Sequence, residues 1–345
     1  MATINRYGEG DVVLSTDKVV TSTWSNNTNN LTEFYTSSIQ ATQTDPNSQG
    51  NFFFEIYNEP TSSVSASVQL SIGFGHRNGS GSKDFTNDTG SFGFSGTKVV
   101  YNQFRQLIYG DETQNFVFGS HTPDSIYVIN VNRSRYRHNL KPGSLNLKLK
   151  AGGVSKVLAL TDDSVTTTGS AVTTLVGRQF NIVSGSDGVM SGSNINLSVA
   201  SGSFGLFYPD AGLIILNPGA LSDATRGIPM LSPGVDSNTN NENIQKIHSA
   251  LEHGEQFIVD SEERISSQYY FTRVKNFEFN YTTNPSFVDD QGNLNFTSMI
   301  DMPRVYISTV GLYNDNGDLL AVAKLSQPVA KDFTKEALIR VKLDY

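Results

Sequence analysis

Residues 314–318 form an acidic, Asn-rich loop within VGLYNDNGDLLAVAKLSQP (310–328), and this loop is where the sequence comes nearest to a metal site. Amide and carboxylate oxygens could bind Ca²⁺, which an EF-hand loop holds with ligands at positions 1, 3 and 5, glycine at 6 and glutamate at 12. Counted from Asn314, glycine stands at position 4, and leucines occupy positions 6 and 12. The calcium-loop interpretation therefore fails where the template is most demanding.

The same loop contains Asn316-Gly317, which favours a different structure. This dipeptide is a strong hairpin signal, because both central residues of a type I′ turn adopt positive φ. The flanking runs VYISTVGLY (305–313) and LLAVAKL (319–325) have the length and content of strands. The sequence thus predicts a type I′ hairpin rather than an ion site.

A Gly-rich segment at 73–96 could in principle cradle a phosphate. Asn78 occupies the place of the third glycine of a dinucleotide fingerprint, and Lys83 lacks the glycine and hydroxyl neighbours of a phosphate loop. A surface loop between two elements is the better interpretation. Its aromatic residues are expected to order the loop against a neighbouring protein; they are Phe85, Phe92 and Phe94.

Catalytic side chains do not fall into the arrangements that enzymes use. There is no Gly-X-Ser-X-Gly elbow, and His248 and His253 stand at i, i+5 rather than the i, i+4 spacing of a zinc-protease helix. Asp162-Asp163 and Asp289-Asp290 are adjacent pairs in turn-like sequence, whereas glycosidases need two separated carboxylates flanking a cleft. We expect no enzymatic activity, no cofactor and no metal site.

One cationic cluster stands out against an acidic background. Arg133, Arg135 and Arg137 recur at period two, so on a strand they would share one face, with Tyr136 on the other. Two interpretations stay open. The arginines could protect a solvated sheet edge, or they could form a docking stripe for an acidic neighbouring subunit.

Elements that would position these residues are mostly strands. Period-two alternation in SVSASVQLSIGFG (63–75), SIYVINV (125–131) and SLNLKLK (144–150) predicts antiparallel sheets, sandwich- or barrel-like, joined by long Gly/Ser-rich loops. FGLFYPDAGLIILNPGAL (204–221) predicts a hairpin that turns at 209–212.

Helix signals are few, and one to three short helices are expected. Val100, Phe104, Leu107 and Ile108 have helical spacing before Gly110, and Ile244, Ile247 and Leu251 have it before Gly254. A Pro-, Ser- and Asn-rich stretch at 229–241 is the best linker candidate. We expect an N-terminal β-rich domain at 1–150, a Ser/Thr/Gly-rich β region at 151–235, and a C-terminal domain with a short helix and an antiparallel sheet at 236–345.

The C-terminal run EALIRVKLDY (336–345) alternates without interruption. One face carries Ala337, Ile339, Val341, Leu343 and Tyr345, and the other carries Leu338, Arg340, Lys342 and Asp344. With the 305–325 hairpin and SSQYYFTRVKNFEFNY (266–281), this run predicts an antiparallel sheet of four or more strands with one apolar face.

Composition limits the partners. In 345 residues, 25 Lys and Arg face 33 Asp and Glu, and the net charge of −8 disfavours general binding to nucleic acid and to anionic membranes. The absence of cysteine excludes disulfides and zinc–thiolate sites. No apolar run approaches the roughly 20 residues of a membrane helix, so membrane insertion is not expected.

Several long segments resemble a family of virion structural proteins of large tailed bacteriophages. They are SEERISSQYYFTRVKNFEFNYTTNPSF (261–287), the 305–328 run, 336–345, GSFGLFYPDAGLIILNPGAL (202–221) and GRQFNIVSGSDG (177–188). The resemblance covers roughly residues 130–345. It implies a tail, neck or baseplate component that assembles in several copies, without cofactor, with other virion proteins and with copies of itself.

From that resemblance we expect the protein in the tail region of the virion, after assembly in the host cytoplasm. A receptor- or polysaccharide-binding tail module is the alternative, because aromatic residues on β surfaces can stack on sugars. Trp24, Tyr269 and Tyr270 are its candidate residues.

Overall fold

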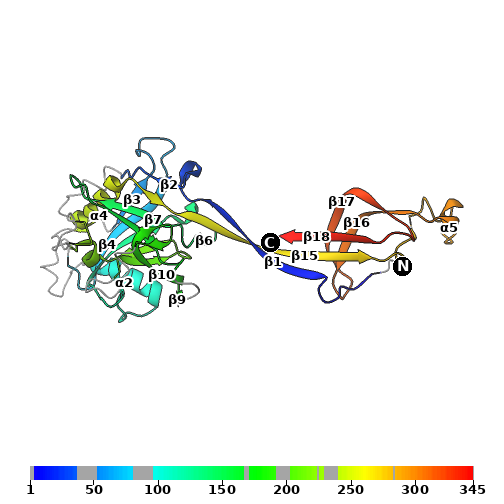
Figure 1. Ribbon diagram of the computed structural model, residues 1–345, viewed down its shortest axis with the longest axis horizontal. Helices are drawn as coiled ribbons and strands as arrows, with labels where there is room; N and C mark the ends of the chain where they lie inside the picture. The colour runs from blue at the N-terminus through cyan, green and yellow to red at the C-terminus, as the bar shows by residue number, and fades with distance from the viewer. Residues whose placement is uncertain are drawn as a thin grey trace. The chain divides into compact units, whose positions relative to one another are not determined.

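The computed structural model is mostly β, with 44% strand and 14% helix, which confirms the expected fold class (Figure 1). Its named sheets are built from antiparallel pairs. The structure describes residues 4–36, 53–80, 96–166, 171–191, 203–223, 225–228, 240–282 and 284–344.

The chain divides into two compact units. Unit 1 comprises Met1–Lys18 and Arg264–Tyr345, and unit 2 comprises Val19–Glu263. This division differs from the expected segments 1–150, 151–235 and 236–345. The reason is strand pairing across the sequence: strands from the first two expected segments share one sheet, and the two ends of the chain meet in another.

Unit 2 is built on one large sheet that curls into a half-barrel, in agreement with the barrel-like expectation. The main path of its described strands is β2–β14–β7–β8–β10–β12–β13–β5–β4–β3, and β9 and β11 each pair with β10 beside this path. The bounds are β2 (Asn30–Leu31), β3 (Phe53–Tyr57), β4 (Val68–His76), β5 (Ser125–Val131), β7 (Asn146–Lys150), β8 (Val157–Asp162), β9 (Val172–Thr174), β10 (Gly177–Ser186), β11 (Val189–Met190), β12 (Gly205–Tyr208), β13 (Leu213–Leu216) and β14 (Phe257–Ile258).

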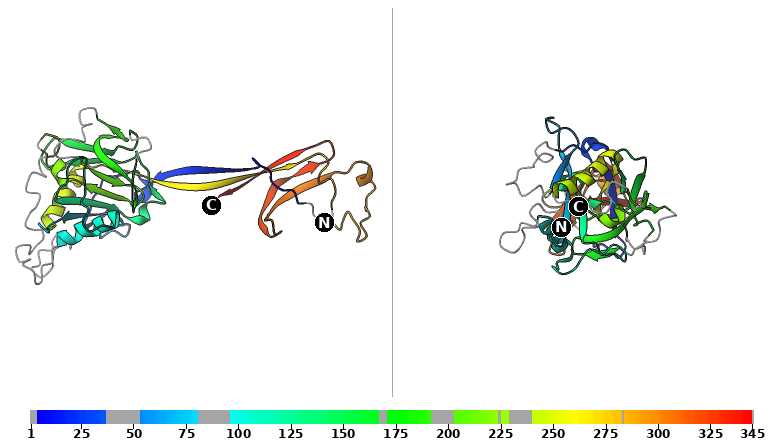
Figure 2. Two further views of the ribbon diagram at one scale, coloured as in Figure 1. Left: turned by 90° about the horizontal axis from the view of Figure 1, so that it is seen from below. Right: turned by 90° about the vertical axis from the view of Figure 1, so that its left-hand side faces the viewer.

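Both faces of the central strands are covered. In β5, Tyr127 and Ile129 belong to one apolar cluster, and Ile126 and Val128 belong to a second. The first cluster includes side chains of α4 (Asn240–Gly254), and the second includes side chains of α2 (Gly96–Tyr109). The two helices therefore pack on opposite faces, beside the strands in Figure 2, and β12 and β13 are buried along their whole length.

Both expected helices are confirmed. α2 stops before Gly110, which has φ +66° and whose N–H donates to the carbonyl of Gln106 at 2.9 Å. α4 ends at Gly254, as its spacing predicted. Two single-turn helices, α3 (Pro218–Leu221) and α5 (Ser298–Asp301), bring the number in the described residues to four, one more than expected.

The β12–β13 hairpin turns at residues 209–212, as predicted. The N–H of Gly212 donates to the carbonyl of Pro209 at 3.4 Å, and Gly212 has φ +67°. A Cβ at this position would lie 2.7 Å from the ring of Tyr136. The turn therefore requires glycine for two reasons: its backbone conformation and the ring packed against it.

The strands of unit 1 belong to two small sheets instead of the single sheet expected from the sequence. β15 (Asp260–Val274) lies between β1 (Val12–Ser22) and β18 (Ala337–Asp344), whereas β16 (Val305–Tyr313) pairs, among the described strands, only with β17 (Leu319–Lys331). The sheets are joined by packing, because Val310 and Leu312 of β16 share a cluster with Ile339 and Val341 of β18. Alternation predicted which residues face inward but not which strands pair.

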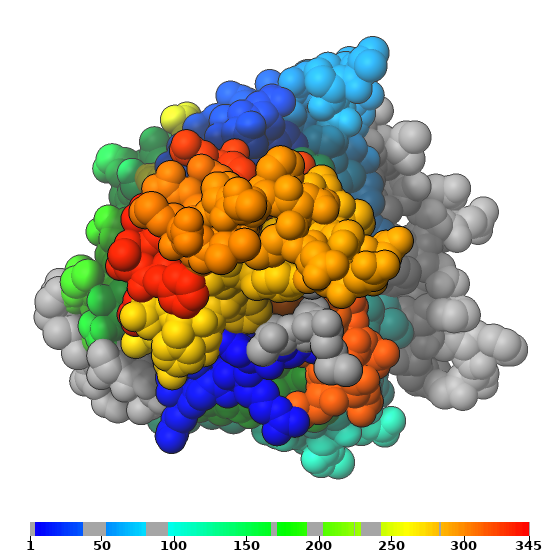
Figure 3. All heavy atoms as spheres, turned by 90° about the vertical axis from the view of Figure 1, so that its right-hand side faces the viewer, coloured from blue at the N-terminus to red at the C-terminus, as the bar shows by residue number. Residues whose placement is uncertain are grey.

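The expected alternation of β18 is confirmed. Ile339 and Val341 are buried, and the residues between and beside them are exposed; Tyr345 lies outside the described residues. The eight paired positions of β18 run from Ser267↔Asp344 to Val274↔Ala337 of β15. On the other side of β15, the N–H of Phe271 donates to the carbonyl of Asp11, and Figure 3 shows the N-terminal residues in blue beside the yellow β15 segment.

The loop at 314–318 joins β16 to β17, which confirms the hairpin but not its turn type. Gly317 has φ +87°, whereas Asn316 has no positive φ, so this is not a type I′ turn. The N–H of Gly317 donates to the carbonyl of Asn314, and Asn314 forms three further bonds with Asp318, at 2.8–3.0 Å. These side chains close a five-residue loop, and the same oxygens are thereby used within the chain.

A buried lysine fixes one end of this hairpin. Lys331 is fully buried, and its Nζ donates to the carbonyls of Asn276 and Asp332 and to Oδ1 of Asn280, at 2.8–3.0 Å. An ammonium group has three donors, and all three are used. Lys331 thus ties the loop after β15 to the end of β17.

Candidate interaction surface

The arginine cluster does not lie on a strand. β5 ends at Val131, and Arg133–Arg135 form a short 3-10 helix. The side chain of Asn132 accepts a hydrogen bond from the backbone N–H of Ser134 at 3.0 Å, which caps this turn and competes with continued strand pairing. The three guanidinium groups therefore do not share a strand face, and this part of the sequence interpretation is wrong.

Two of the arginines are engaged within unit 2. Arg133 donates to the carbonyl of Tyr136 at 2.6 Å and lies 4.6 Å from its ring centroid, and Arg135 donates to Oγ of Ser25 at 2.6 Å. The side chain of Arg137 is exposed. Tyr136 is buried against the 209–212 turn, so this cluster stabilises local structure at the same time as it presents charge.

The aromatic residues proposed as loop contacts, Phe85, Phe92 and Phe94, lie outside the described residues. The flanking segments are described: β4 ends at His76, and α2 begins at Gly96. Oγ1 of Thr97 donates to the carbonyl of Ser80 at 2.9 Å, so the two flanks are held together.

The first acid pair, Asp162–Asp163, was expected in a turn, but the structure places it at the buried end of a strand. Asp162 ends β8 and is buried, and its Oδ2 accepts from the N–H of Gly143 at 2.8 Å and from Oγ of Ser164. Its Oδ1 has no hydrogen-bond partner, and burial raises the pKa of this carboxyl. Asp163 instead accepts two hydrogen bonds from Asn181, both at 2.9 Å.

Adjacent carboxylates in this pair thus have separate structural partners. The second pair does lie in a turn, where Asp289 accepts from the backbone of Gln291 and from the backbone and side chain of Asn293. These hydrogen bonds, with the Asn293 side chain the largest cause, lower the pKa of Asp289. Neither pair forms two carboxyl groups across a cleft.

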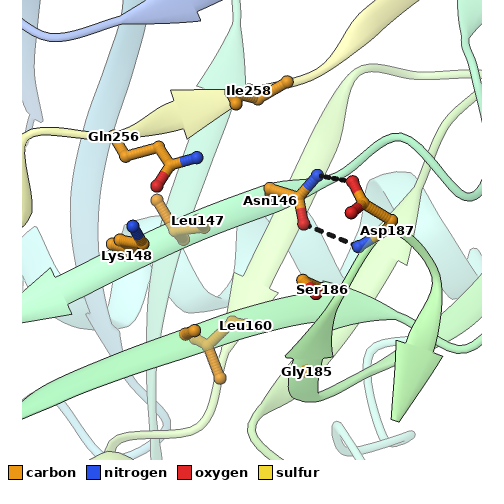
Figure 4. A pocket seen from close by; sticks show the side chains of 10 residues that line it. Asn146, Leu147, Lys148, Leu160, Gly185, Ser186, Asp187, Gln256 and Ile258 are labelled. Carbon is orange, nitrogen blue, oxygen red and sulfur yellow. Dashed lines mark hydrogen bonds between the residues drawn. The ribbon is translucent and has the colours of Figure 1, made fainter.

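A pocket of about 430 Å³ opens between β7, β8, β14 and the β10–β11 turn (Figure 4). Among the lining residues, Asn146 and Asp187 lie side by side and are joined by two hydrogen bonds of 2.7 Å. Asp187 is the only carboxylate among the lining side chains, and Lys148 is the only amine. The paired Asn146 and Asp187 serve to dock the turn on β7.

That β10–β11 turn was missed in the sequence, although a signal was present. Asp187 and Gly188 have φ +52° and +73°, and they are the two central residues between Ser186 and Val189, which pair. Asp-Gly is a preferred dipeptide for such a hairpin. The strand on its far side has only two residues, which is too short for alternation to be recognised.

Aromatic residues proposed for sugar stacking are not free platforms. Trp24 is buried and donates its Nε1–H to the carbonyl of Phe257 at 2.7 Å. Tyr270 packs against the unit 1 core. Tyr269 has the cations of Arg340 and Lys342 within 5.5 and 5.8 Å of its ring centroid.

A more prominent surface lies on the outer side of the β16–β17 sheet. Thr309↔Lys324 and Gly311↔Val322 alternate with inward pairs, so their side chains point away from the core. We call the large exposed side chains there and at the hairpin end the outer hairpin face. They are Tyr306, Tyr313, Leu319, Leu320 and Val322, each between 47% and 68% exposed.

Unit 1 as a whole is rich in exposed apolar side chains. It holds more than half of those found among the described residues, although it has fewer than a third of the chain's residues. Besides the outer hairpin face, they include Val12, Val13, Leu14, Phe277, Phe287, Phe296, Ile300, Met302, Phe333 and Leu338. The buried members of its core cluster are Val310, Leu312, Ile339 and Val341.

Comparisons with protein families, with curated proteins and with solved structures find no match to this chain. Within the described residues, no group of three or more His, Cys, Asp or Glu side chains is placed to hold a metal ion. No helix in the described part of the chain is long and apolar enough to cross a membrane.

Proposed function

We propose that this protein is a non-enzymatic structural subunit of a tailed-phage virion, which bridges tail, neck or baseplate components in a multi-copy assembly. The proposal draws on the resemblance of residues 130–345 to virion structural proteins. The observation that carries it is the unusual surface of unit 1, where large apolar side chains outnumber those in its own buried cluster.

Such a surface has a physical consequence. Apolar side chains left in water cost free energy, and contiguous apolar patches on soluble proteins mark sites of interaction. Unit 1 has a small core, so packing against partners would supply stability that its own fold supplies only in part. This is the behaviour of a protein that works within a particle.

Four side chains that the sequence singled out as possible catalytic groups make structural hydrogen bonds or contacts, which is compatible with the proposal. Asp162 and Asp163 accept hydrogen bonds from neighbouring strands and turns. A ring nitrogen of His248 lies 2.8 Å from the carbonyl of Phe34, and one of His253 lies 2.8 Å from the carbonyl of Ser249. These contacts are structural.

The test is to look for the protein in purified particles. We expect mass spectrometry of gradient-purified phage to detect it in a fixed ratio to the major tail protein, and gold-labelled antibody to mark the tail, neck or baseplate. Its absence from particles, although it is present in infected cells, would overturn the proposal. Cleavage of host polysaccharide by the purified protein would overturn its non-enzymatic part.

A further inference from the structure

We propose that the outer hairpin face is a contact surface between copies of this chain. This inference rests on the proposed function as a multi-copy subunit and assigns the surface through which the copies meet. The partner is a second copy of unit 1, packed with its β16–β17 hairpin against the same hairpin of its neighbour.

Geometry makes this face suitable for close packing. Gly311 lies between the side chains of Tyr313 and Leu319: a Cβ at Gly311 would be 2.9 Å from the tyrosine ring and 3.3 Å from Cδ1 of the leucine. The two side chains therefore lie over the bare backbone of Gly311, and Val322 stands opposite it in the strand register. The result is a low aromatic and aliphatic platform instead of isolated projecting side chains.

The exposed area of the outer hairpin face is also large enough to form a substantial part of a protein–protein interface. Two-stranded sheets are marginally stable by themselves, and this one is supported on its inner side only. The five side chains of the outer hairpin face expose on the order of 500 Å² in total, given the surface of large apolar residues. A standard interface buries roughly 800 Å² per partner, so this face supplies a large part of one.

Charge indicates that the partner is a copy of the same chain. Identical surfaces bring identical charges together, which is tolerated only where the net charge is small. Unit 1 has 11 Lys and Arg against 12 Asp and Glu, a formal charge of −1, whereas unit 2 has 14 against 21, a formal charge of −7. Copies that meet through unit 1 avoid most of the repulsion that unit 2 would cause.

Charges on the hairpin itself are self-complementary. Its tip carries Asp315 and Asp318, and Lys324 lies on the outer side further along β17. When two hairpins pack antiparallel about an axis near Val322, the acidic tip of each approaches Lys324 of the other. The apolar platforms then meet in the centre, with opposite charges at the rim.

The experiment compares two substitutions in the full-length chain. Val322→Glu places a carboxylate on the outer hairpin face, and Val172→Glu places one on β9 of unit 2; the two valines are 60% and 58% exposed. By sedimentation velocity we expect wild-type protein and Val172→Glu to self-associate alike, and Val322→Glu to self-associate at least tenfold more weakly. Circular dichroism checks that each variant is folded.

A second measurement keeps the test valid if Val322→Glu fails to fold. The chain has no cysteine, so Val322→Cys and Val172→Cys each introduce a single reactive thiol. A short bismaleimide should link Val322→Cys into covalent dimers and leave Val172→Cys monomeric. Wild-type protein that is monomeric at tens of micromolar, or equal cross-linking of the two variants, would overturn the inference. Monomeric protein that still enters particles would overturn this inference alone, and self-associating protein absent from particles would overturn only the proposed function.

Discussion

Lys331 shows how one side chain can hold two segments of unit 1 together, the loop after β15 and the end of β17. It is fully buried without a carboxylate among its three hydrogen-bond acceptors, so carbonyl and amide oxygens alone solvate its amino group. A buried donor set of this kind contributes to stability only while every bond is made. The cost of losing it therefore exceeds that of losing an ordinary surface lysine.

Replacing Lys331 by methionine should lower the free energy of unfolding by about 2–4 kcal/mol, because three hydrogen bonds are lost and the buried acceptor on Asn280 is left without its donor. Lys335→Met is the control, since Lys335 is exposed and forms only a 3.6 Å ion pair with Asp332. Urea titration of both variants measures the difference. Equal stability of the two would show that the buried bonds contribute nothing net.

Asp162 predicts a pH dependence of stability. Burial raises the folded-state pKa of this carboxyl above its ordinary value, so the native state holds the proton more tightly than the unfolded chain does. The stabilisation is complete at a pH below the ordinary value of 3.8 and is lost as the pH rises through the folded-state pKa. Wild-type protein should therefore lose part of its stability as the pH rises through the folded-state pKa of Asp162.

Asp162→Asn removes this ionisation and keeps an oxygen for the N–H of Gly143 and Oγ of Ser164. Relative to wild type, the Asp162→Asn variant should gain stability as the pH rises from about 4 to 7, because the unpartnered Oδ1 no longer carries charge. Thermal melts at several pH values follow the difference. A difference that is constant with pH would contradict the expected role of the buried carboxyl.

At the scale of elements, the β12–β13 hairpin depends on Gly212. Gly212→Ala should lower the free energy of unfolding by about 2–4 kcal/mol, through a left-handed backbone and a clash with the Tyr136 ring. Gly292→Ala separates these causes, because Gly292 also has positive φ (+87°) and has open space around it. We expect it to cost about 1 kcal/mol in the same urea titration. Similar losses at both positions would exclude the ring contact as a cause.

β18 supplies half of the buried cluster of unit 1 and one side of β15. Truncation after Lys335 removes Ile339 and Val341, so the hairpin packed on them should lose its support. Hydrogen exchange should show residues 305–331 unprotected in the truncated chain, while the sheet of unit 2 keeps its protection. Retained protection of 305–331 would mean that β16 and β17 do not need β18.

Much of the element structure could be predicted from local signals. The two helices, the 209–212 turn and the alternation of β18 follow from spacing and turn residues alone. The sequence could not predict that β18 pairs with β15 while β16 and β17 form a separate sheet. Period-two alternation shows which residues share a face of a strand, but it does not show which strands are neighbours. Side-chain hydrogen bonds explain two further differences from the predictions. The cap formed by Asn132 favours a 3-10 helix where a strand with an arginine stripe was expected, and the bonds between Asn314 and Asp318 close a five-residue loop where a type I′ turn was expected.

The candidate surface was only partly visible in the sequence. LLAVAKL (319–325) is so apolar that its pattern gives no reason to place one side in water. The structure shows Ala321 and Ala323 facing the core and Val322 facing out. The small residues are inside and the large one outside, which is the reverse of what burial of apolar volume would suggest for a monomer.

At the scale of the whole molecule, the two units differ in the size of the buried apolar core that stabilises each of them. Two large apolar clusters support unit 2, whereas the cluster of unit 1 has four buried residues. If copies contact each other through unit 1, its unfolding should depend on protein concentration.

Calorimetry between about 2 and 100 µM should show this difference. The transition of unit 1 should move to higher temperature with concentration, because association stabilises only the folded form, and that of unit 2 should stay in place. Hydrogen exchange of residues 305–344 at the same temperatures tests whether the concentration-dependent transition is the unfolding of unit 1. Two transitions that are both independent of concentration would contradict a stabilising self-contact.

The position of β15 between β1 and β18 has a consequence for synthesis. Unit 2 is a continuous stretch of chain and can fold while translation proceeds, but the central strand of the unit 1 sheet needs neighbours from residues 12–22 and 337–344. The first of these neighbours is distant in sequence and the second is made last, so the contacts form late and slowly. The hairpin that we assign to self-association rests on β18. Nascent and prematurely terminated chains would therefore lack a finished contact surface, and incorporation into an assembly would be restricted to chains translated through residue 344.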